Sequence, residues 1–491
     1  MRFEYELIPE LPRLAWAARV RRNEPVVRVL HGAWVETRPD CFFEGAWDGP
    51  FEDGRFDEAE TFAGSGGRVR DGEVVFAGPS HTFDRLFAIR TNDEFHIANS
   101  LAFVLAVSEE RLDQNYKHYY LNFLDFNRDG IRHKEKRLRL AGTRFMEVHD
   151  CCNVVVQPGL TVSRAEKPLG TPPRGYDDYI AFVMKTLEAV LANARDPRRK
   201  QTYRPVTQMS RGYDSVAVSI LAARAGCREA ASFRKSNSAR GYEDDGGREI
   251  APYLGLQLTE YERTDYDMLA ERHDDEFYIE PGGIDRQMVL MEKQLVGSIQ
   301  LQGRYGERFW SREWCSRWGL PGEYGNPYLA VPTRHKIGGC GLGEFRLRTG
   351  FIDFPVSCIR GLHAPAIKRL SESKAMDPWS VGGDYDRPIV RRLAEEAGVP
   401  QHLFGQSKKG GPRAGGPEIR SWANRMIYAA WHATYWAPLR LLILKLTGHT
   451  LNPAWRQGSF GVQRRVERIR EQYLAAIMHA ASHSTRQTNL I

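Results

Sequence analysis

The chain has 491 residues, of which 42% are hydrophobic and 27% charged, and its formal net charge is +7. These values predict two or three folded domains and exclude an intrinsically disordered chain. The charge is small for this length, so it permits an anionic ligand such as a nucleotide without indicating a nucleic-acid partner. The seven cysteines form no Cys-x-x-Cys pair, which favours a reducing cytoplasm over a disulfide scaffold.

Neither the beginning of the sequence nor its most apolar stretch indicates a membrane protein. The opening residues, MRFEYELIPELP, are not expected to act as a signal peptide because acidic residues interrupt any apolar run. Residues 436–448 are apolar but too short to span a membrane, and Arg440 and Lys445 interrupt them. A buried helix is the favoured interpretation of this stretch, and a helix on a membrane surface is the alternative. We therefore expect a cytoplasmic protein with no membrane partner.

The amino-terminal third, to about Thr161, has the pattern of short strands and turns. Residues 69–78 and 85–100 are β-rich runs split by Asp-Gly and Asn-Asp, which predicts two hairpins. The segment Lys167–Gly175, KPLGTPPRG, is rich in proline and glycine and is the predicted linker.

After the linker, predicted helices and strands alternate. Residues 176–194 place five apolar residues on one helical face, with Asp177 or Asp178 as the expected N-cap: Ile180, Val183, Leu187, Val190 and Leu191. Strands are predicted at 205–210, 229–236 and 256–263, separated by helices at 215–226, ending at Gly226, and at 245–255. This alternation predicts a parallel α/β sheet. Beyond about Ile352 the pattern is mostly helical.

The turn SRGYDS, Ser210–Ser215, is the strongest candidate for a ligand site. In a parallel α/β unit such a strand-to-helix turn lies at the carboxyl end of the sheet, where unpaired N–H groups favour an anion. Gly212 would let the backbone approach a phosphate, and the hydroxyls of Ser210 and Ser215 can donate to its oxygens. Asp214 can hold Mg²⁺. The alternative is an ordinary turn capped by Asp or Ser.

SRGYDS resembles the SGGxDS pyrophosphate-binding loop of the ATP pyrophosphatase superfamily, in particular the synthetase domain of the asparagine synthetase family. That family also includes β-lactam synthetases and lasso-peptide cyclases. Ser210, Gly212, Asp214 and Ser215 match the loop, and Arg211 stands where the family has its first glycine. Four later segments resemble further family motifs in the same order, and with the loop they cover about half of the chain: 229–262, 298–310, 344–353 and 386–411.

The resemblance implies a fold class. Residues 176–491 would form the α/β synthetase domain, with a parallel sheet flanked by helices and a helical carboxyl-terminal part. Residues 1–168 would form a β-rich α+β glutaminase-like (Ntn-type) domain, on the fainter similarity of residues 97–107 and 112–124. The family's glutaminase uses an amino-terminal cysteine, whereas this chain begins Met-Arg and its first cysteine is Cys41, so glutamine hydrolysis is not expected.

The resemblance also implies a reaction: ATP adenylates a substrate carboxylate, pyrophosphate leaves, and an amine takes the acyl group to form an amide. The implied cofactors are ATP and Mg²⁺, with Asp214 and Glu307 as metal ligands and Lys408 or Lys409 as the catalytic cation. Nine residues would bind the nucleotide: Ser210, Arg211, Gly212, Tyr213, Asp214, Ser215, Ser232, Phe233 and Gly303. Each has a structural alternative, such as an ion pair between Glu307 and the neighbouring Arg304 or Arg308.

Two other functions remain open. A PP-loop enzyme that modifies RNA would carry a strongly basic or cysteine-paired domain, which this sequence lacks. A degenerate family member would bind a nucleotide or a partner without catalysis, and Arg211, Arg304 and Arg308 at family Gly or acidic positions favour it. The carboxylate and amine substrates, small molecules or peptides, would be selected by loops near 265–291 and 313–343. No nucleic-acid partner is expected, and an oligomer is left open.

Overall fold

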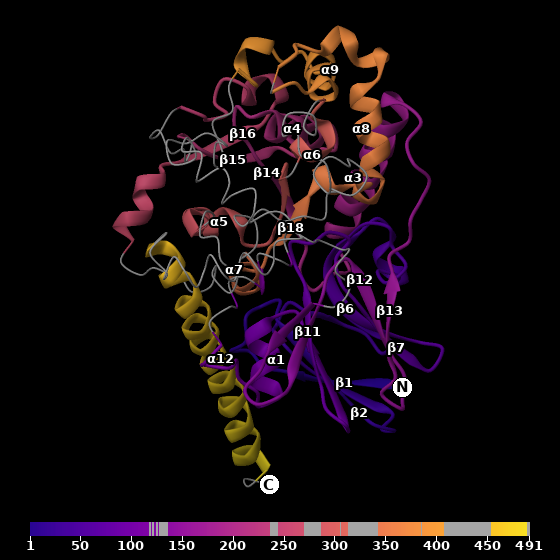
Figure 1. Cartoon of the computed structure of the whole chain (residues 1–491), viewed down its shortest axis with the longest axis vertical. Coiled ribbons are helices and arrows are strands. Elements are labelled where there is room, and N and C mark those ends of the chain that lie inside the picture. Colours follow the sequence, from indigo (N-terminus) through magenta and orange to yellow (C-terminus); the bar gives the residue numbers. More distant parts are fainter. Residues whose placement is uncertain are drawn as a thin grey trace, which may run out of the picture.

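The structure is a computed structural model in which two units are stacked, a β-rich unit and an α/β unit (Figure 1). It describes residues 1–116, 119, 122–123, 126, 136–235, 244–269, 286–304, 306–312, 342–383, 385–406 and 453–488. Within these ranges no helix combines the length and the apolar character that crossing a membrane requires.

The first unit consists of two sheets packed face to face. One has the strand order β1-β3-β2-β9-β8-β11-β10 and the other β13-β12-β7-β6-β5-β4; only β1 and β3 run parallel, and the other neighbours are antiparallel. The strands are β1 (Arg2–Leu7), β2 (Trp16–Arg21), β3 (Val26–His31), β4 (Glu36–Thr37), β5 (Cys41–Trp47), β6 (Phe62–Arg70), β7 (Glu73–Ala77), β8 (Leu86–Arg90), β9 (Glu94–Ala98), β10 (Lys136–Arg139), β11 (Phe145–His149), β12 (Cys152–Val156) and β13 (Val162–Glu166).

Both predicted hairpins are confirmed. Asp71 and Gly72 join β6 to β7 with φ of 53° and 79°, the left-handed conformation that a two-residue turn of this hand requires. The alternating apolar side chains of the two sheets then meet in one core, in which Trp16 lies edge-on to Phe42 at a ring distance of 4.9 Å.

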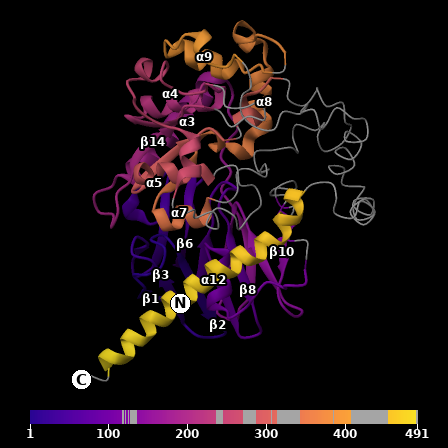
Figure 2. The same cartoon turned by 90° about the vertical axis from the view of Figure 1, so that its left-hand side faces the viewer.

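Two helices cover the outer face of the seven-stranded sheet. α1 (Leu101–Val107) begins at Ser100, whose hydroxyl accepts the N–H of Phe103, and it packs on β8 and β9. α12 (Pro453–Thr488) lies across α1, and Tyr473 stacks on Phe103 with ring centroids 4.4 Å apart. Figures 1 and 2 show α12 along the outside of the first unit, so the last helix of the expected second domain packs on the first.

The second unit is built on a five-stranded sheet in which every neighbouring pair is parallel, as predicted. Its strands are β14 (Arg204–Gln208), β15 (Glu229–Phe233), β16 (Gln257–Tyr261), β17 (Ser298–Gln302) and β18 (Ile352–Pro355). The order across the sheet is β16-β15-β14-β17-β18. The chain therefore adds strands outward from β14 in one direction and then, from β17, in the other.

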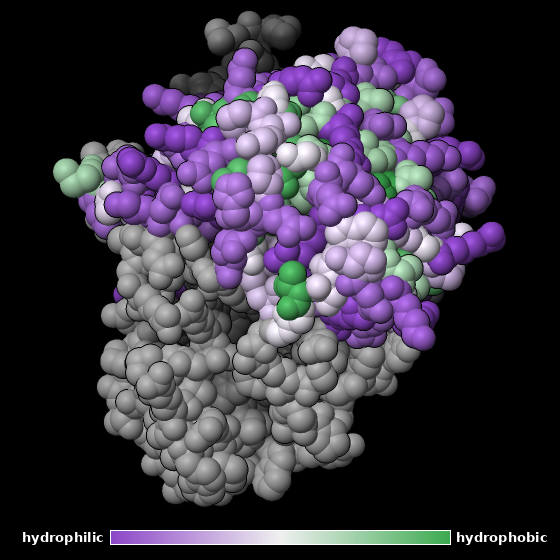
Figure 3. All heavy atoms as spheres, turned by 90° about the horizontal axis from the view of Figure 1, so that it is seen from above, coloured by the Kyte–Doolittle hydropathy of each residue, from purple (hydrophilic) through white to green (hydrophobic). Residues whose placement is uncertain are grey.

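Helices flank this sheet: α3 (Tyr176–Ala194), α4 (Tyr213–Arg224), α5 (Glu292–Leu295), α6 (Gly306–Trp310), α7 (Gly343–Thr349), α8 (Ala364–Glu372) and α9 (Pro388–Glu396). Short 3-10 turns are η1 (Phe51–Asp53), η3 (Ala251–Leu254), η4 (Arg263–Met268), η6 (Arg286–Met291), η7 (Val356–Cys358), η8 (Gly361–His363), η9 (Lys374–Trp379) and η10 (Gln401–Leu403). Seen from above in Figure 3, most of the described surface of this unit is hydrophilic.

Two local predictions are wrong. The N-cap of α3 is Gly175, and Asp177 and Asp178 lie inside the first turn, where a carboxylate still favours the positive end of the helix dipole. The helix predicted at 245–255 is only the 3-10 turn η3, because Pro252 has no N–H to donate and Gly255 adopts the left-handed conformation that ends it.

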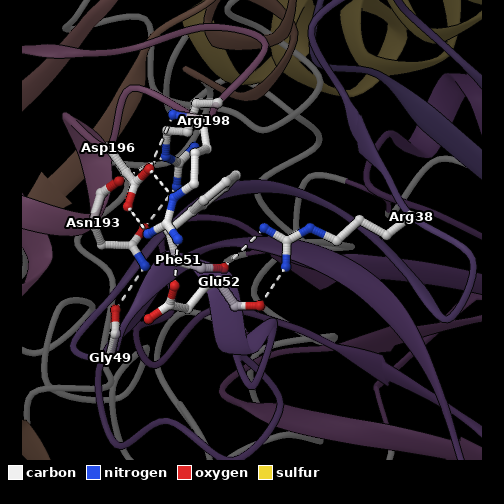
Figure 4. Close-up of polar contacts among 8 residues, drawn as sticks. Arg38, Gly49, Phe51, Glu52, Asn193, Asp196 and Arg198 are labelled. Atoms are coloured by element: carbon white, nitrogen blue, oxygen red, sulfur yellow. Dashed lines mark hydrogen bonds and ion pairs between the residues drawn. The ribbon is translucent and has the colours of Figure 1, made fainter.

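The two units meet along a polar boundary. Figure 4 shows one part of it, where the side-chain amide of Asn193 in α3 donates to the carbonyl of Gly49 at 2.8 Å. Nearby, the exposed Arg198 pairs with Glu52. Deeper in the boundary, Arg346 of α7 donates to both carboxylate oxygens of Glu44 in β5, at 2.7 and 3.0 Å. Side chains from both units are therefore buried together.

Candidate functional site

The SRGYDS turn joins β14 to α4 at the point where the strand order of the sheet reverses. β15 and β17 lie parallel to β14 on either side of it, so the turn after β14 and the loop after β17 leave the sheet at the same edge. In open parallel sheets this switch point is where a crevice forms and ligands bind. The turn therefore lies at the carboxyl end of a strand of a parallel sheet, as predicted, and the ligand site itself stays a prediction.

Hydrogen bonds within the turn hold its two serines together. The hydroxyls of Ser210 and Ser215 are 2.7 Å apart, and the N–H of Gly212 donates to Ser210 Oγ at 3.2 Å. Gly212 is the N-cap of the 12-residue α4 and has an extended backbone, and no side chain caps the helix. The matching residues of the loop are therefore brought together at a helix end whose N–H groups can bind an anion.

The loop after β17 presses against this turn. A Cβ on Gly303 would lie 2.3 Å from the carbonyl oxygen of Asp214, and one on Gly306 would lie 2.6 Å from Asp214 Oδ1. Only glycine allows backbone to approach this closely. The structure thus brings Gly303 to the turn, as predicted, and adds Gly306, which the sequence analysis did not single out.

Asp214 is paired with a buried arginine. Arg387, which immediately precedes α9, donates from Nη1 to Asp214 Oδ1 and from Nε to Ser311 Oγ at 3.2 Å. Its guanidinium carbon lies 5.1 Å from the ring centroid of Tyr385 and 5.6 Å from that of Tyr213. The predicted metal ligand therefore has a cationic partner of its own in this structure.

Glu307 acts on the same guanidinium. It lies in the first turn of α6 and is buried. Burial opposes the charge of Arg387, but Asp214, followed by Tyr385 and Glu307, outweighs it and raises the pKa of that guanidinium. One or two carboxylates together with phosphate oxygens are a donor set that Mg²⁺ uses, and Asp214 and Glu307 both act on the Arg387 guanidinium. Within the described ranges no third His, Cys, Asp or Glu joins them to form a complete metal cluster.

Arg211 points away from the turn and towards acidic residues. Its guanidinium lies 3.5 Å from Asp244 and 3.3 Å from Glu249, and its Nε donates to the carbonyl of Leu403 at 3.0 Å. The Arg211 carbonyl accepts the N–H of Gly405 at 2.9 Å. The residue that replaces the family's glycine thus ties the turn to the segments around η3 and η10.

Ser232 and Phe233 end β15, next to the turn. Ser232 is fully buried, and its hydroxyl accepts the N–H of Gly247 at 3.3 Å. The ring of Phe233 is covered by the guanidinium of Arg263 at 4.0 Å. Both side chains have structural partners, and the adjacent backbone at the carboxyl end of β15 shares the sheet edge with the turn.

Lys408 and Lys409 lie outside the described residues, as does most of the predicted specificity loop 313–343. The sequence analysis missed Arg387 and Tyr385, although the segment containing Arg387 was singled out for its lysines. The available signal was the Arg-Pro pair at the start of an amphipathic helix, which places a cation at a helix beginning.

Comparison with known proteins adds nothing to these residues: no family model matches the chain, and no curated protein matches it.

Proposed function

We propose that the chain is an ATP-dependent, AMP-forming ligase of the asparagine synthetase type that joins a carboxylate to an amine. One observation carries the proposal: the Ser-x-Gly-x-Asp-Ser turn lies at the switch point of a parallel sheet, with Gly303 packed on Asp214. A turn of this composition in an arbitrary connection would not meet a second glycine loop there.

In the proposed reaction, an oxygen of the substrate carboxylate attacks the α-phosphorus of ATP, and the bond to pyrophosphate breaks. The amine then attacks the acyl carbon, AMP leaves, and an amide forms. The N–H groups at the start of α4 and the hydroxyls of Ser210 and Ser215 would hold the departing pyrophosphate. Asp214 and Glu307 would bind Mg²⁺, which neutralises part of the phosphate charge.

Two positively charged groups complete the proposed site. Arg387 is a buried cation paired with Asp214 of the turn, and it would face the phosphates once Asp214 binds the metal. Lys408 and Lys409, which follow the segment bonded to Arg211, are proposed to stabilise the charge on the reacting acyl group. The first unit, two packed sheets, is proposed as a glutaminase-like domain without glutaminase activity, and the protein is proposed to work in the cytoplasm.

A second function is a non-catalytic module that binds a nucleotide or a partner. The observation that favours it is the engagement of Arg211 by Asp244 and Glu249, which closes one side of the turn without a ligand.

Calorimetry of ATP binding in the presence of Mg²⁺ tests the proposal. We expect wild-type protein to bind ATP and Asp214→Ala to lose at least tenfold in affinity, because it removes the proposed metal ligand. Asp93→Ala is the matched control: this carboxylate is 86% exposed in a hairpin of the first unit and should bind as wild type does.

Pyrophosphate release upon addition of candidate carboxylates then separates the two functions. Binding with release supports the ligase, and binding without release from any acid supports the module. A folded wild-type protein that binds no ATP, alone or with candidate acids, contradicts the ligase and leaves only a module that binds a partner.

A further inference from the structure

Three hydroxyl groups converge on Gly212 of the SRGYDS turn. A Cβ on this glycine would lie 3.3 Å from the hydroxyl oxygen of Ser210, 3.8 Å from that of Ser215 and 3.9 Å from that of Tyr385. The two serines belong to the turn, whereas Tyr385 comes from the segment just before α9. None of the four residues is buried, so the group lies at the surface of the candidate site. Together they form the hydroxyl cradle.

Neither the backbone nor the packing requires a glycine at position 212. Its φ of −75° and ψ of 149° are an extended conformation that any residue adopts. A Cβ there would meet nothing closer than 3.3 Å, whereas a Cβ on Gly303 or Gly306 would lie 2.3 or 2.6 Å from Asp214. The fold therefore needs the two glycines after β17, but it does not need Gly212. The space that Gly212 leaves open lies among three hydroxyls, which can donate to a ligand oxygen.

Tyr385 is held at the cradle by contacts that do not use its hydroxyl. Its ring lies on that of Tyr213, with centroids 4.7 Å apart, and the guanidinium carbon of Arg387 is 5.1 Å from its centroid. The next residue, Asp386, fixes the backbone, because its buried carboxylate accepts the N–H of Val381 at 3.1 Å. The position of the hydroxyl is therefore set before any ligand arrives.

The hydroxyl of Tyr385 keeps its proton. Burial raises the pKa of Tyr385 to about 12; Arg387 opposes the rise, Asp214 adds to it, and a hydrogen bond from the Tyr213 backbone opposes it. The side chain is therefore neutral at pH 7, and it can donate a hydrogen bond to an anion.

Two charged side chains border the cradle, and they have opposite signs. Arg387 pairs with Asp214, so a phosphate entering the cradle meets a pair that is close to neutral. Mg²⁺ bound at Asp214 would add positive charge and release the guanidinium towards the phosphate. Phosphate groups should consequently bind in the cradle more tightly with Mg²⁺ than without it.

We propose that Tyr385 is a phosphate-binding residue, whose hydroxyl donates to an oxygen of the pyrophosphate part of ATP. That oxygen lies in the space above Gly212, between the hydroxyls of Tyr385 and of the two serines. The inference rests on the proposed function for the identity of the ligand. It adds a donor that comes from outside the turn, and it gives Gly212 a role that the fold alone does not.

Calorimetry with inorganic pyrophosphate and Mg²⁺ on the full chain tests the role of the hydroxyl. Tyr385→Phe keeps the ring and removes the donor, so it should weaken pyrophosphate binding about tenfold relative to wild type. Tyr253→Phe is the matched control. It makes the same change at a tyrosine that is 53% exposed, and it should bind as wild type does.

Gly212→Ala tests the space. Its methyl group would fill the cradle, so pyrophosphate affinity should fall at least tenfold. Gly175→Ala is the matched control, because Gly175 is the N-cap of α3, has an extended backbone and would have nothing within 4 Å of its Cβ. Both variants replace an N-cap glycine, so their melting temperatures should agree within about 2 °C. Only Gly212→Ala should lose binding.

Three results would overturn the proposal. Wild-type protein that binds no pyrophosphate with Mg²⁺ would show that the cradle is not a phosphate site. Tyr385→Phe that binds as tightly as wild type would remove the hydroxyl from the contacts, and tighter binding would show that it obstructs the phosphate. Gly212→Ala that melts well below Gly175→Ala and still binds would assign this glycine to the fold.

The proposal and the ligase function can fail separately. Pyrophosphate binding that depends on Tyr385, without pyrophosphate release from ATP by any acid, would uphold the cradle and contradict the ligase. Release from ATP in the wild type, with pyrophosphate binding unchanged in Tyr385→Phe, would uphold the ligase and contradict the role of Tyr385.

Discussion

Two buried arginine–carboxylate pairs, one at the unit boundary and one at the SRGYDS turn, differ in how completely they are satisfied. Arg346 donates to both oxygens of Glu44, and one of those oxygens also accepts the hydroxyl of Ser65 at 2.8 Å. The two charged side chains are 2% and 0% exposed. Arg387 instead contacts Asp214 through a single nitrogen, and the Asp214 side chain is 23% exposed.

The difference separates a structural pair from an exchangeable one. The hydrogen bonds that Glu44 accepts come from side chains of the protein. Removing Arg346 would therefore leave a buried carboxylate without its cation. Asp214 keeps access to solvent and shares its cation with Glu307, so under the proposed function a metal ion would exchange with the guanidinium more easily here than at Glu44. A fold that must stay assembled uses the first arrangement, and a site that must change its occupant uses the second.

The largest expected effect on the free energy of unfolding is at the boundary between the two units. Arg346→Met removes the cation and leaves Glu44 buried without it, which should lower the free energy of unfolding by about 3–5 kcal/mol. Urea denaturation measures this loss. Arg198→Met, at an exposed ion pair of the same boundary (Figure 4), should leave the urea midpoint unchanged. A loss below about 1 kcal/mol for Arg346→Met would show that the two pairs do not differ as proposed.

An intermediate effect on the free energy of unfolding is expected at Asp353, a buried carboxylate in β18. It accepts a hydrogen bond from the side-chain amide of Gln302, whereas Glu44 accepts two from an arginine. Burial raises its pKa to about 6, with Asp84 adding to the rise while Arg304 and Arg346 oppose it. The folded state therefore holds the proton more tightly than the unfolded state between about pH 4 and 6. Stability contributed by this group is full below that window and is lost as pH rises through it.

The neutral variant Asp353→Asn should consequently raise the free energy of unfolding by about 2–3 kcal/mol at pH 7 and change it little at pH 4. Urea denaturation at the two pH values measures the difference. The exposed Asp93→Asn should show no such dependence on pH. Equal effects of Asp353→Asn at both pH values would mean that the protonation of Asp353 does not change between pH 4 and pH 7.

The smallest effect on stability is expected at the turn. Arg387→Met should cost only about 1 kcal/mol, because the released carboxylate of Asp214 can be hydrated. The same variant should weaken ATP binding about tenfold by calorimetry, since a cation facing the phosphates is lost. Arg387→Lys, which keeps the charge, should recover part of that affinity. A stability loss as large as that of Arg346→Met, with ATP binding unchanged, would assign Arg387 to the structure alone.

The local sequence pattern was sufficient to predict those elements of the fold that are determined by residues close together in the sequence. The two hairpins, the apolar face of α3 and the alternation from β14 to β16 follow from turn residues and periodicity. The prediction failed at 245–255, where the apolar spacing of a helix is present but Pro252 removes a donor.

Partners distant in sequence could not be predicted in the same way. Asp214 and Arg387 are 173 residues apart, and no periodicity connects them. The placement of Gly303 followed from order along the chain, and the need for glycine there became clear only from its 2.3 Å approach to Asp214.

The position of α12 has a consequence for how the chain is made. Val462, Val466, Ile469 and Tyr473 complete the apolar layer over α1, yet they are synthesised after the entire α/β unit. At roughly 5–20 residues per second, the growing chain carries an uncovered α1 for tens of seconds before its cover leaves the ribosome. The β-rich unit, although first in the sequence, is thus the last to be completed, because its apolar layer over α1 needs the last helix of the chain.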